Sequence, residues 1–165
     1  SGELIVKYDK DYLQMDFPHR NPVRAELPTN IYESLSIKPK EILKSRDYVL
    51  VYENEDQIKN IKIDKELFDK KNIDPGGVVI TAKGKNSDFV SRYFVPQCSF
   101  FEDPVTGSTH CSLVPYWSKK LGKQKLTSMQ LSERGGEMFC IDKGDRVLIN
   151  GKAQTYSVGK VFLKN

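Results

Sequence analysis

One repeated pattern in the second half of the chain constrains the fold more than any other feature. Short runs rich in β-branched and aromatic residues alternate there with glycine-containing turns, which is typical of antiparallel strands. The pair Asn150-Gly151 is a strong signal for a tight hairpin turn. We therefore expect four consecutive strands, at 126–133, 136–142, 145–150 and 155–164.

Strand-like runs also dominate the first half of the chain. Residues 3–8 and 12–18 flank a polar turn, and residues 12–18 alternate apolar and polar side chains. Residues 76–84 and 87–96 flank a second turn, and 47–53 form a further β-branched and aromatic run. The sequence thus predicts two more hairpins and one separate strand.

Three segments favour helices. Residues 27–37 predict a short helix with Thr29 or Asn30 as its N-cap, and 54–72 predict two helical pieces. The strongest candidate is 108–121. These elements do not alternate as β-α-β units do, so the sequence predicts an α+β fold with several antiparallel strands and one central helix.

Composition sets the remaining bounds. The chain has 165 residues, enough for a real core in one domain or in two very small ones. Its net charge of +4 comes without a basic cluster interleaved with aromatic residues, so charge does not indicate nucleic-acid binding. No apolar run approaches the ~18–20 residues that span a bilayer. Three scattered cysteines favour a reducing, cytoplasmic setting, and with only two histidines a zinc site is not expected.

The stretch FEDPVTGSTHC, residues 101–111, leads into the strongest helix. Gly107, Ser108 and Thr109 crowd the helix start with small side chains, and Ser108 or Thr109 can cap it. Gly122 can end the helix, and Pro115 should bend it. Free N–H groups at such a helix start favour an anion, so a substrate carboxylate or phosphate would fit there.

Asp103 is the candidate for proton chemistry. Pro104 biases it towards an extended conformation at the mouth of the helix, where a carboxylate can take or give a proton on a bound acid. The helix end would favour the ionised form, whereas burial beside Phe100 and Phe101 would raise the pKa. From the residues alone, an ordinary turn that caps a helix is the more common interpretation of such a stretch, and a site is the alternative.

Other reactive side chains have simpler interpretations. We expect His110 to be a hydrogen-bonded helix residue, and Cys111 and Cys140 to pack as apolar residues. Arg134-Gly135-Gly136 predicts a hairpin or bulge turn, because it lacks the phosphate-loop pattern. A cysteine–histidine hydrolase built on His110 and Cys111 is disfavoured, since adjacent helix residues point roughly 100° apart.

The motifs resemble a known family. The segments FEDPVTGSTHCSLVPYWSKKLGK, MQLSERGGEM and RVLINGKAQTYSVGKVFL closely resemble the C-terminal half of PhzF-like proteins, the phenazine-biosynthesis family related to diaminopimelate epimerase. SGELIVKY, MDFP and SDFVSRYFVP follow the same order and spacing. The resemblance covers nearly the whole chain, and EDPVTGS together with SERGG is a specific pair. It therefore favours a site over an ordinary capping turn.

The resemblance implies a fold and a chemistry. The family fold has two similar α+β lobes, each a curved, mostly antiparallel sheet wrapped around a central helix, with the site between them. Members are isomerases or epimerases that move a proton at a carbon without a cofactor, a metal or pyridoxal phosphate. Asp103 matches the catalytic carboxylate, and Gly107, Ser108 and Thr109 match the substrate-contacting turn. Cys111 is then not a nucleophile.

One departure from the family pattern affects the expected domain organisation. The N-terminal lobe of the family carries a "GNP"-type segment and the principal catalytic glutamate, and neither is found in this sequence. We therefore expect residues 1–165 to form a single lobe that resembles the C-terminal half, with the N-terminal lobe absent. Its partners would be a small carboxylate substrate and either the missing lobe or a second copy. Whether the lobe alone is an enzyme stays open, and the alternative is a non-catalytic binding or interaction module.

Overall fold

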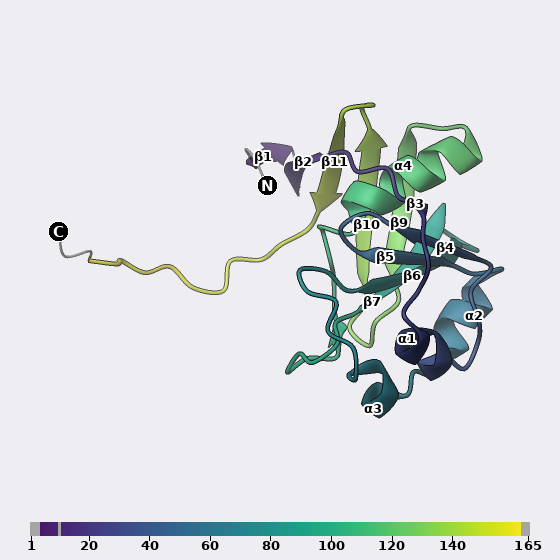
Figure 1. The fold of residues 1–165 in the computed structure, drawn as a ribbon. Coiled ribbons are helices and arrows are strands. Elements are labelled where there is room, and N and C mark those ends of the chain that lie inside the picture. The colour runs from purple at the N-terminus through teal and green to yellow at the C-terminus, as the bar shows by residue number, and fades with distance from the viewer. Residues whose placement is uncertain (1–3, 10, 163–165) are drawn as a thin grey trace.

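The computed structural model describes residues 4–9 and 11–162 of the chain. Its central feature is an 11-stranded sheet (Figure 1). The strands are β1 (Ile5–Asp9), β2 (Tyr12–Pro18), β3 (Val23–Arg24), β4 (Glu41–Lys44), β5 (Tyr48–Val51), β6 (Val78–Lys83), β7 (Phe89–Phe94), β8 (Glu102–Asp103), β9 (Lys125–Gln130), β10 (Gly136–Asp142) and β11 (Arg146–Gly151).

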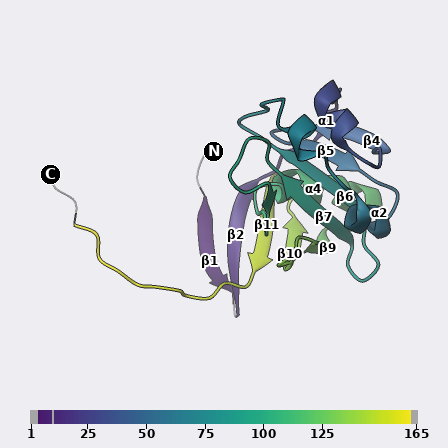
Figure 2. The same cartoon turned by 90° about the horizontal axis from the view of Figure 1, so that it is seen from below.

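The strand order shows that the sheet is mostly antiparallel, as predicted. It runs β1-β2-β11-β10-β9-β7-β6-β5-β4-β3, and β8 pairs with β7 beside this path. Only the β5–β6 and β7–β9 pairs are parallel among the described strands. The hairpins β1–β2 and β6–β7 form where the polar turns predict them, and Figure 2 shows β1, β2, β11 and β10 side by side at one end of the sheet.

Helix α4 (His110–Leu121) is the central helix, so this prediction is also confirmed. Its buried residues Leu113, Val114 and Trp117 pack in one core with residues of seven strands, β4 to β7 and β9 to β11. The indole Nε1 of Trp117 donates a hydrogen bond to Thr81 Oγ1 at 3.0 Å, which satisfies the buried polar atom. The helix contains Pro115 and ends at Gly122, whose φ of 66° suits glycine.

Three short helices cover the other face of the sheet. They are α1 (Thr29–Ser34), α2 (Glu55–Asn60) and α3 (Lys65–Phe68). Ile31, Ile58 and Phe68, one from each helix, pack with Leu50 and Ile80 of the sheet in a second core. Figure 1 shows these helices on the side of the sheet opposite α4. The family-like α+β fold is therefore present: a sheet curved around α4, closed on its outer face by α1–α3.

The prediction of a fourth strand at 155–164, joined through a hairpin turn at Asn150-Gly151, is wrong. Residues 155–162 form no regular element and their side chains are exposed, while 163–165 lie outside the described residues. Asn150 donates to the carbonyl of Phe139 and accepts from Gln14 Nε2, both at 2.9 Å, so it is bound to strands on both sides. Because β2 and β10 occupy both edges of β11, no edge remains for a hairpin partner.

Two capping predictions are also wrong. Helix α1 has Pro28 at its N-cap position, and no side chain caps it. Thr109 stands at the N-cap position of α4, but its hydroxyl donates to the carbonyl of Thr106 instead of accepting from the helix. Within the described ranges, no helix has the length and apolar character needed to cross a membrane.

Candidate functional site

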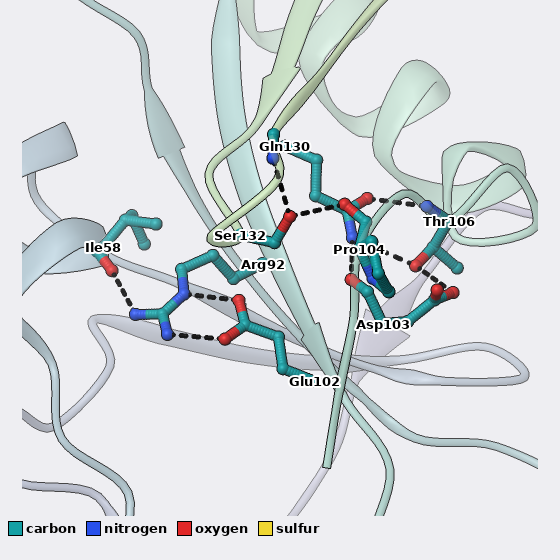
Figure 3. Close-up of polar contacts among 9 residues, drawn as sticks. Ile58, Arg92, Glu102, Asp103, Pro104, Thr106, Gln130 and Ser132 are labelled. Atoms are coloured by element: carbon teal, nitrogen blue, oxygen red, sulfur yellow. Dashed lines mark hydrogen bonds and ion pairs between the residues drawn. The ribbon is translucent and has the colours of Figure 1, made fainter. Parts of the chain in front are cut away.

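The site begins at the short strand β8. Asp103 pairs with Tyr93 of β7, and the neighbouring Glu102 forms a two-pronged ion pair with Arg92, with N–O distances of 2.7 and 2.8 Å (Figure 3). A third guanidinium nitrogen of Arg92 donates to the carbonyl of Ile58 at 3.1 Å. Glu102 is therefore an anchor that fixes the strand, whereas Asp103 forms no ion pair among the described residues.

A small hydrogen-bond network holds Asp103 in place. The hydroxyl of Thr106 donates to Asp103 Oδ2 at 2.7 Å, and the N–H of Thr106 donates to Gln130 Oε1 at 2.8 Å. Gln130 Nε2 in turn donates to the carbonyl of Asp103 at 2.6 Å (Figure 3). The buried amide of Gln130 thus closes both ends of the turn from Asp103 to Thr106, while the Asp103 side chain stays half-buried.

The turn between β9 and β10 locks against this first turn. Ser132 Oγ donates to the carbonyl of Pro104 at 2.6 Å and accepts from the N–H of Gly135 at 3.1 Å. Gly135 has a φ of 71°, and a Cβ at Gly136 would overlap a methyl group of Val105. The hairpin-turn interpretation of Arg134-Gly135-Gly136 is confirmed, and its glycines are needed for this close approach.

The helix start lies beside the two turns. The N–H groups of His110, Cys111 and Ser112 donate to the carbonyls three residues earlier. The N–H groups of Ser108 and Thr109 have no acceptor among the described residues. Thr109 as a whole is only 1% exposed, so its N–H group is unpaired within the described ranges but buried.

A groove of about 900 Å³ opens next to the helix start. Gly107 and Ser108 line it, as do Met15 and Phe17 of β2. Val105, Met138 and Phe139 extend the apolar part of the lining, and Arg134, Glu137 and Lys152 supply its charged groups. The structure therefore brings Gly107 and Ser108 together at the groove, whereas Asp103 is half-buried and not among the lining residues, and Thr109 is buried.

The histidine and the cysteine at the helix start are both buried. His110 is fully buried, with Nδ1 2.9 Å from the carbonyl of Thr106 and Nε2 2.8 Å from Ser128 Oγ. Burial lowers the pKa of His110 to about 4 and raises the pKa of the Cys111 thiol. Both ring nitrogens are occupied, so His110 cannot activate Cys111, and the interpretation of His110 as a hydrogen-bonded helix residue is confirmed.

The sequence did not identify three residues of this site. Thr106 and Gln130 hold the Asp103 turn, and Arg134 lines the groove. Thr106 and Arg134 lie inside the EDPVTGS and SERGG motifs, whereas no local signal indicates Gln130, which reaches Asp103 from 27 positions away. Across residues 4–9 and 11–162, no group of three or more His, Cys, Asp or Glu side chains is placed to hold a metal ion.

Comparisons with known proteins place this chain in a family. Residues 19–159 match the family model described as phenazine biosynthesis-like protein, PhzC-PhzF. An uncharacterized isomerase of Pseudomonas aeruginosa is 42% identical over 163 residues, which cover 99% of this chain and 62% of that protein. A second uncharacterized isomerase of the same organism is 39% identical, with the same coverage.

Solved structures agree. A crystal structure of a phenazine biosynthesis PhzC/PhzF protein from Clostridium difficile has a TM-score of 0.85 and 39% identity, covering 99% of this chain and 62% of that one. A PhzF family structure from Enterococcus faecalis has a TM-score of 0.84 and 36% identity, covering 96% and 60%. The chain spans about three fifths of the length of these relatives. By sequence and by fold, the chain belongs to the phenazine biosynthesis-like (PhzC-PhzF) family.

Proposed function

We propose that this chain forms one wall of the active site of a cofactor-independent, cytoplasmic isomerase. The reaction is the transfer of a proton at a carbon of a small carboxylate substrate. Two relatives named as isomerases support the reaction class. The observation that carries the proposal is the pairing of two features: a fixed carboxylate, Asp103, and a helix start with two N–H groups unpaired among the described residues, at Ser108 and Thr109, where Ser108 lines an open groove.

The helix start is the substrate-binding part of this proposal. The unpaired N–H group and the hydroxyl of Ser108 offer donors to a carboxylate at the positive end of α4, and the unpaired N–H of Thr109 follows directly in the chain. Gly107 adds no side chain, and a Cβ at this position would lie 3.5 Å from Phe17 and 3.8 Å from Met15. A substrate carboxylate seated here would place the rest of the molecule along the apolar lining of the groove.

Asp103 is the proton-transferring group of this proposal. Thr106 donates to Oδ2 of Asp103, so one carboxylate oxygen is fixed and the other can accept a substrate proton. The carbonyl of Asp103 is held by Gln130, which limits movement of the whole residue. A positioned acid–base group of this kind contributes about 10²–10⁴ in rate.

The opposite wall is supplied by a partner in this proposal. The groove is open and lined largely by apolar side chains, and we expect a partner to cover that surface. Residues 1–165 would then correspond to the C-terminal lobe of the longer relatives. The partner is the lobe that matches the remainder of those relatives, or a second copy of this chain.

Amide chemical shifts test the proposal directly. Titration of the ¹⁵N-labelled chain with propionate should shift the amides of Gly107, Ser108 and Thr109, because the carboxylate binds at their N–H groups. Ser108→Ala should reduce these shifts, because it removes the hydroxyl donor at the helix start. Ser157→Ala, which changes an exposed serine outside every described element, should leave them unchanged. If none of the three amides shifted in the unmodified chain, the helix start would not bind a carboxylate, and the proposal would be contradicted.

A further inference from the structure

Arg134 is a charged residue that the proposed proton transfer does not use. It is exposed on the turn between β9 and β10 and lines the 900 Å³ groove together with Gly107 and Ser108. It also lines a smaller pocket of about 470 Å³ with Glu102 and Pro104, directly beside the Asp103 turn. Arg134 therefore borders both the groove and the proposed proton-transfer turn.

The backbone that carries Arg134 is unusually well fixed for a surface turn. Ser132 ties it to Pro104, and the contact of Gly136 with Val105 leaves no room for a Cβ. Gln130, at the end of β9, holds Asp103 and Thr106. A guanidinium on such a turn is presented in a defined place, which lowers the conformational cost of binding a ligand.

The guanidinium itself has no partner among the described residues. Three carboxylates border the same two pockets, but Glu102 is paired with Arg92, and neither Glu133 nor Glu137 lies within ion-pair distance of Arg134. The other cation on the groove, Lys152, has its ammonium over the ring of Tyr12 at 5.5 Å from the centroid. Arg134 is thus the cation of the groove that is left for a ligand.

We propose that Arg134 binds a second anionic group, so that the substrate is a small dianion with an apolar middle. This inference rests on the proposed function: one carboxylate of the substrate binds at Ser108 and Thr109, and the Arg134 guanidinium binds the anionic group at the other end of the substrate. The planar guanidinium suits a carboxylate because it can donate two parallel hydrogen bonds. Met15, Phe17 and Val105 provide the apolar surface between the two ends.

Matched acids test this inference at low ionic strength. Dicarboxylates from succinate to adipate are compared with monocarboxylates of equal chain length, from butyrate to hexanoate, by titration of the Ser108 and Thr109 amides. The best dicarboxylate should bind about tenfold more tightly than its monocarboxylate partner. Arg134→Gln should reduce this preference to about twofold or less and leave monocarboxylate affinity unchanged.

Lys152→Gln is the matched control, because it removes one positive charge from the same groove. It should keep most of the dicarboxylate preference. An equal loss in both variants would show a general charge effect and overturn the role of Arg134, as would a preference that survives Arg134→Gln. Those results leave the proposed function intact. If neither class of acid shifts the Ser108 and Thr109 amides, the proposed function fails, and the inference fails with it.

Discussion

Thr106 connects the candidate site to the buried core. Its hydroxyl holds Asp103, and its carbonyl accepts from His110 Nδ1 at 2.9 Å. A carbonyl can only accept, so Nδ1 carries the proton and Nε2 accepts from the hydroxyl of Ser128. The neutral imidazole is therefore the form that this packing selects, and its role is to support the turn from inside.

Protonation of His110 should oppose folding in mildly acidic solution. Its pKa is about 4 in the folded chain against an ordinary value of 6.5, so between these values the unfolded chain binds the proton and the folded chain does not. Stability contributed by the neutral ring is full above pH 6.5 and falls as the pH drops towards 4. From pH 7 to pH 5 the free energy of unfolding should fall by about 2 kcal/mol on this account.

Urea unfolding of the wild type and of His110→Asn measures this contribution. The asparagine amide can still donate to Thr106 but does not titrate, so the variant should lose about 2 kcal/mol less than the wild type between pH 7 and pH 5. The variant will be less stable at every pH, because it packs less well. If the wild type and His110→Asn differed by the same free energy of unfolding at pH 7 and at pH 5, the role assigned to His110 would be contradicted.

Gly136 tests the close contact between the two turns. Gly136→Ala places a methyl group against Val105, so we expect a loss of about 1–3 kcal/mol of stability and weaker carboxylate binding. Gly151→Ala is the control, since nothing lies within 4 Å of a Cβ at that position. Thermal and urea unfolding compare the two variants, and equal stability would show that the turns are not locked as described.

At the scale of elements, Gln130 links the end of β9 to the turn before α4. Gln130→Ala removes the acceptor of the Thr106 N–H and the donor to the Asp103 carbonyl. Loss of buried partners costs about 1–3 kcal/mol for each group left unpaired. We expect a lower free energy of unfolding and smaller carboxylate-induced shifts at Ser108.

Gln124→Ala provides the comparison for this prediction. Gln124 is exposed in the loop before β9 and forms no side-chain hydrogen bond within the described ranges. Its variant should lie within about 0.5 kcal/mol of the wild type. If Gln130→Ala also stayed within this range, the hydrogen bonds of Gln130 to Thr106 and Asp103 would contribute nothing measurable to stability.

Local sequence signals predicted most elements but not every pairing. The alternation in 12–18 and the turn between 76–84 and 87–96 are local, and both hairpins form there. Residues 155–162 are also rich in residues that favour strands. A strand additionally needs a free sheet edge to pair with, and β11 is already paired on both sides. Propensity alone cannot show this, because one of the two strands that occupy those edges, β2, lies far away in the sequence.

In the candidate site, too, the local motif was predictable from the sequence, whereas the residues that hold it were not. The helix start and Asp103 were visible as a local motif, and the structure brings Gly107 and Ser108 to the groove. The residues that hold the motif, Gln130 and Ser132, reach it only through the packing of β9 against β7. No periodicity or spacing rule connects them to residues 103–106.

For the whole molecule, the groove side of the sheet is the face that we expect to bind a partner. The edge strand β1 leaves Val6 58% exposed at this groove, and β3 at the opposite edge leaves Val23 66% exposed. If the groove binds a second copy, the sedimentation coefficient should rise with concentration in the micromolar range. Val6→Glu should weaken this association, because it buries a charge in the apolar interface.

Val23→Glu is the matched control, with the same substitution on an equally exposed edge strand. It should sediment as the wild type does. A chain that stays monomeric at all concentrations would exclude the second copy as the partner, and equal effects of the two substitutions would move the interface away from the groove.

The proton-transfer role of Asp103 is the central claim, and hydrogen–deuterium exchange into a bound acid tests it most directly. A single carboxylate can remove a proton and return a deuteron from solvent, so this exchange does not require the opposite wall. We would incubate 3-butenoate with the chain in D₂O and follow its C2 protons by NMR. The wild type should exchange them faster than buffer, and Asp103→Asn should lower the rate by about 10² or more while the Ser108 amide still shifts. Equal exchange by the wild type and Asp103→Asn, or no exchange above buffer by the wild type, would contradict the account.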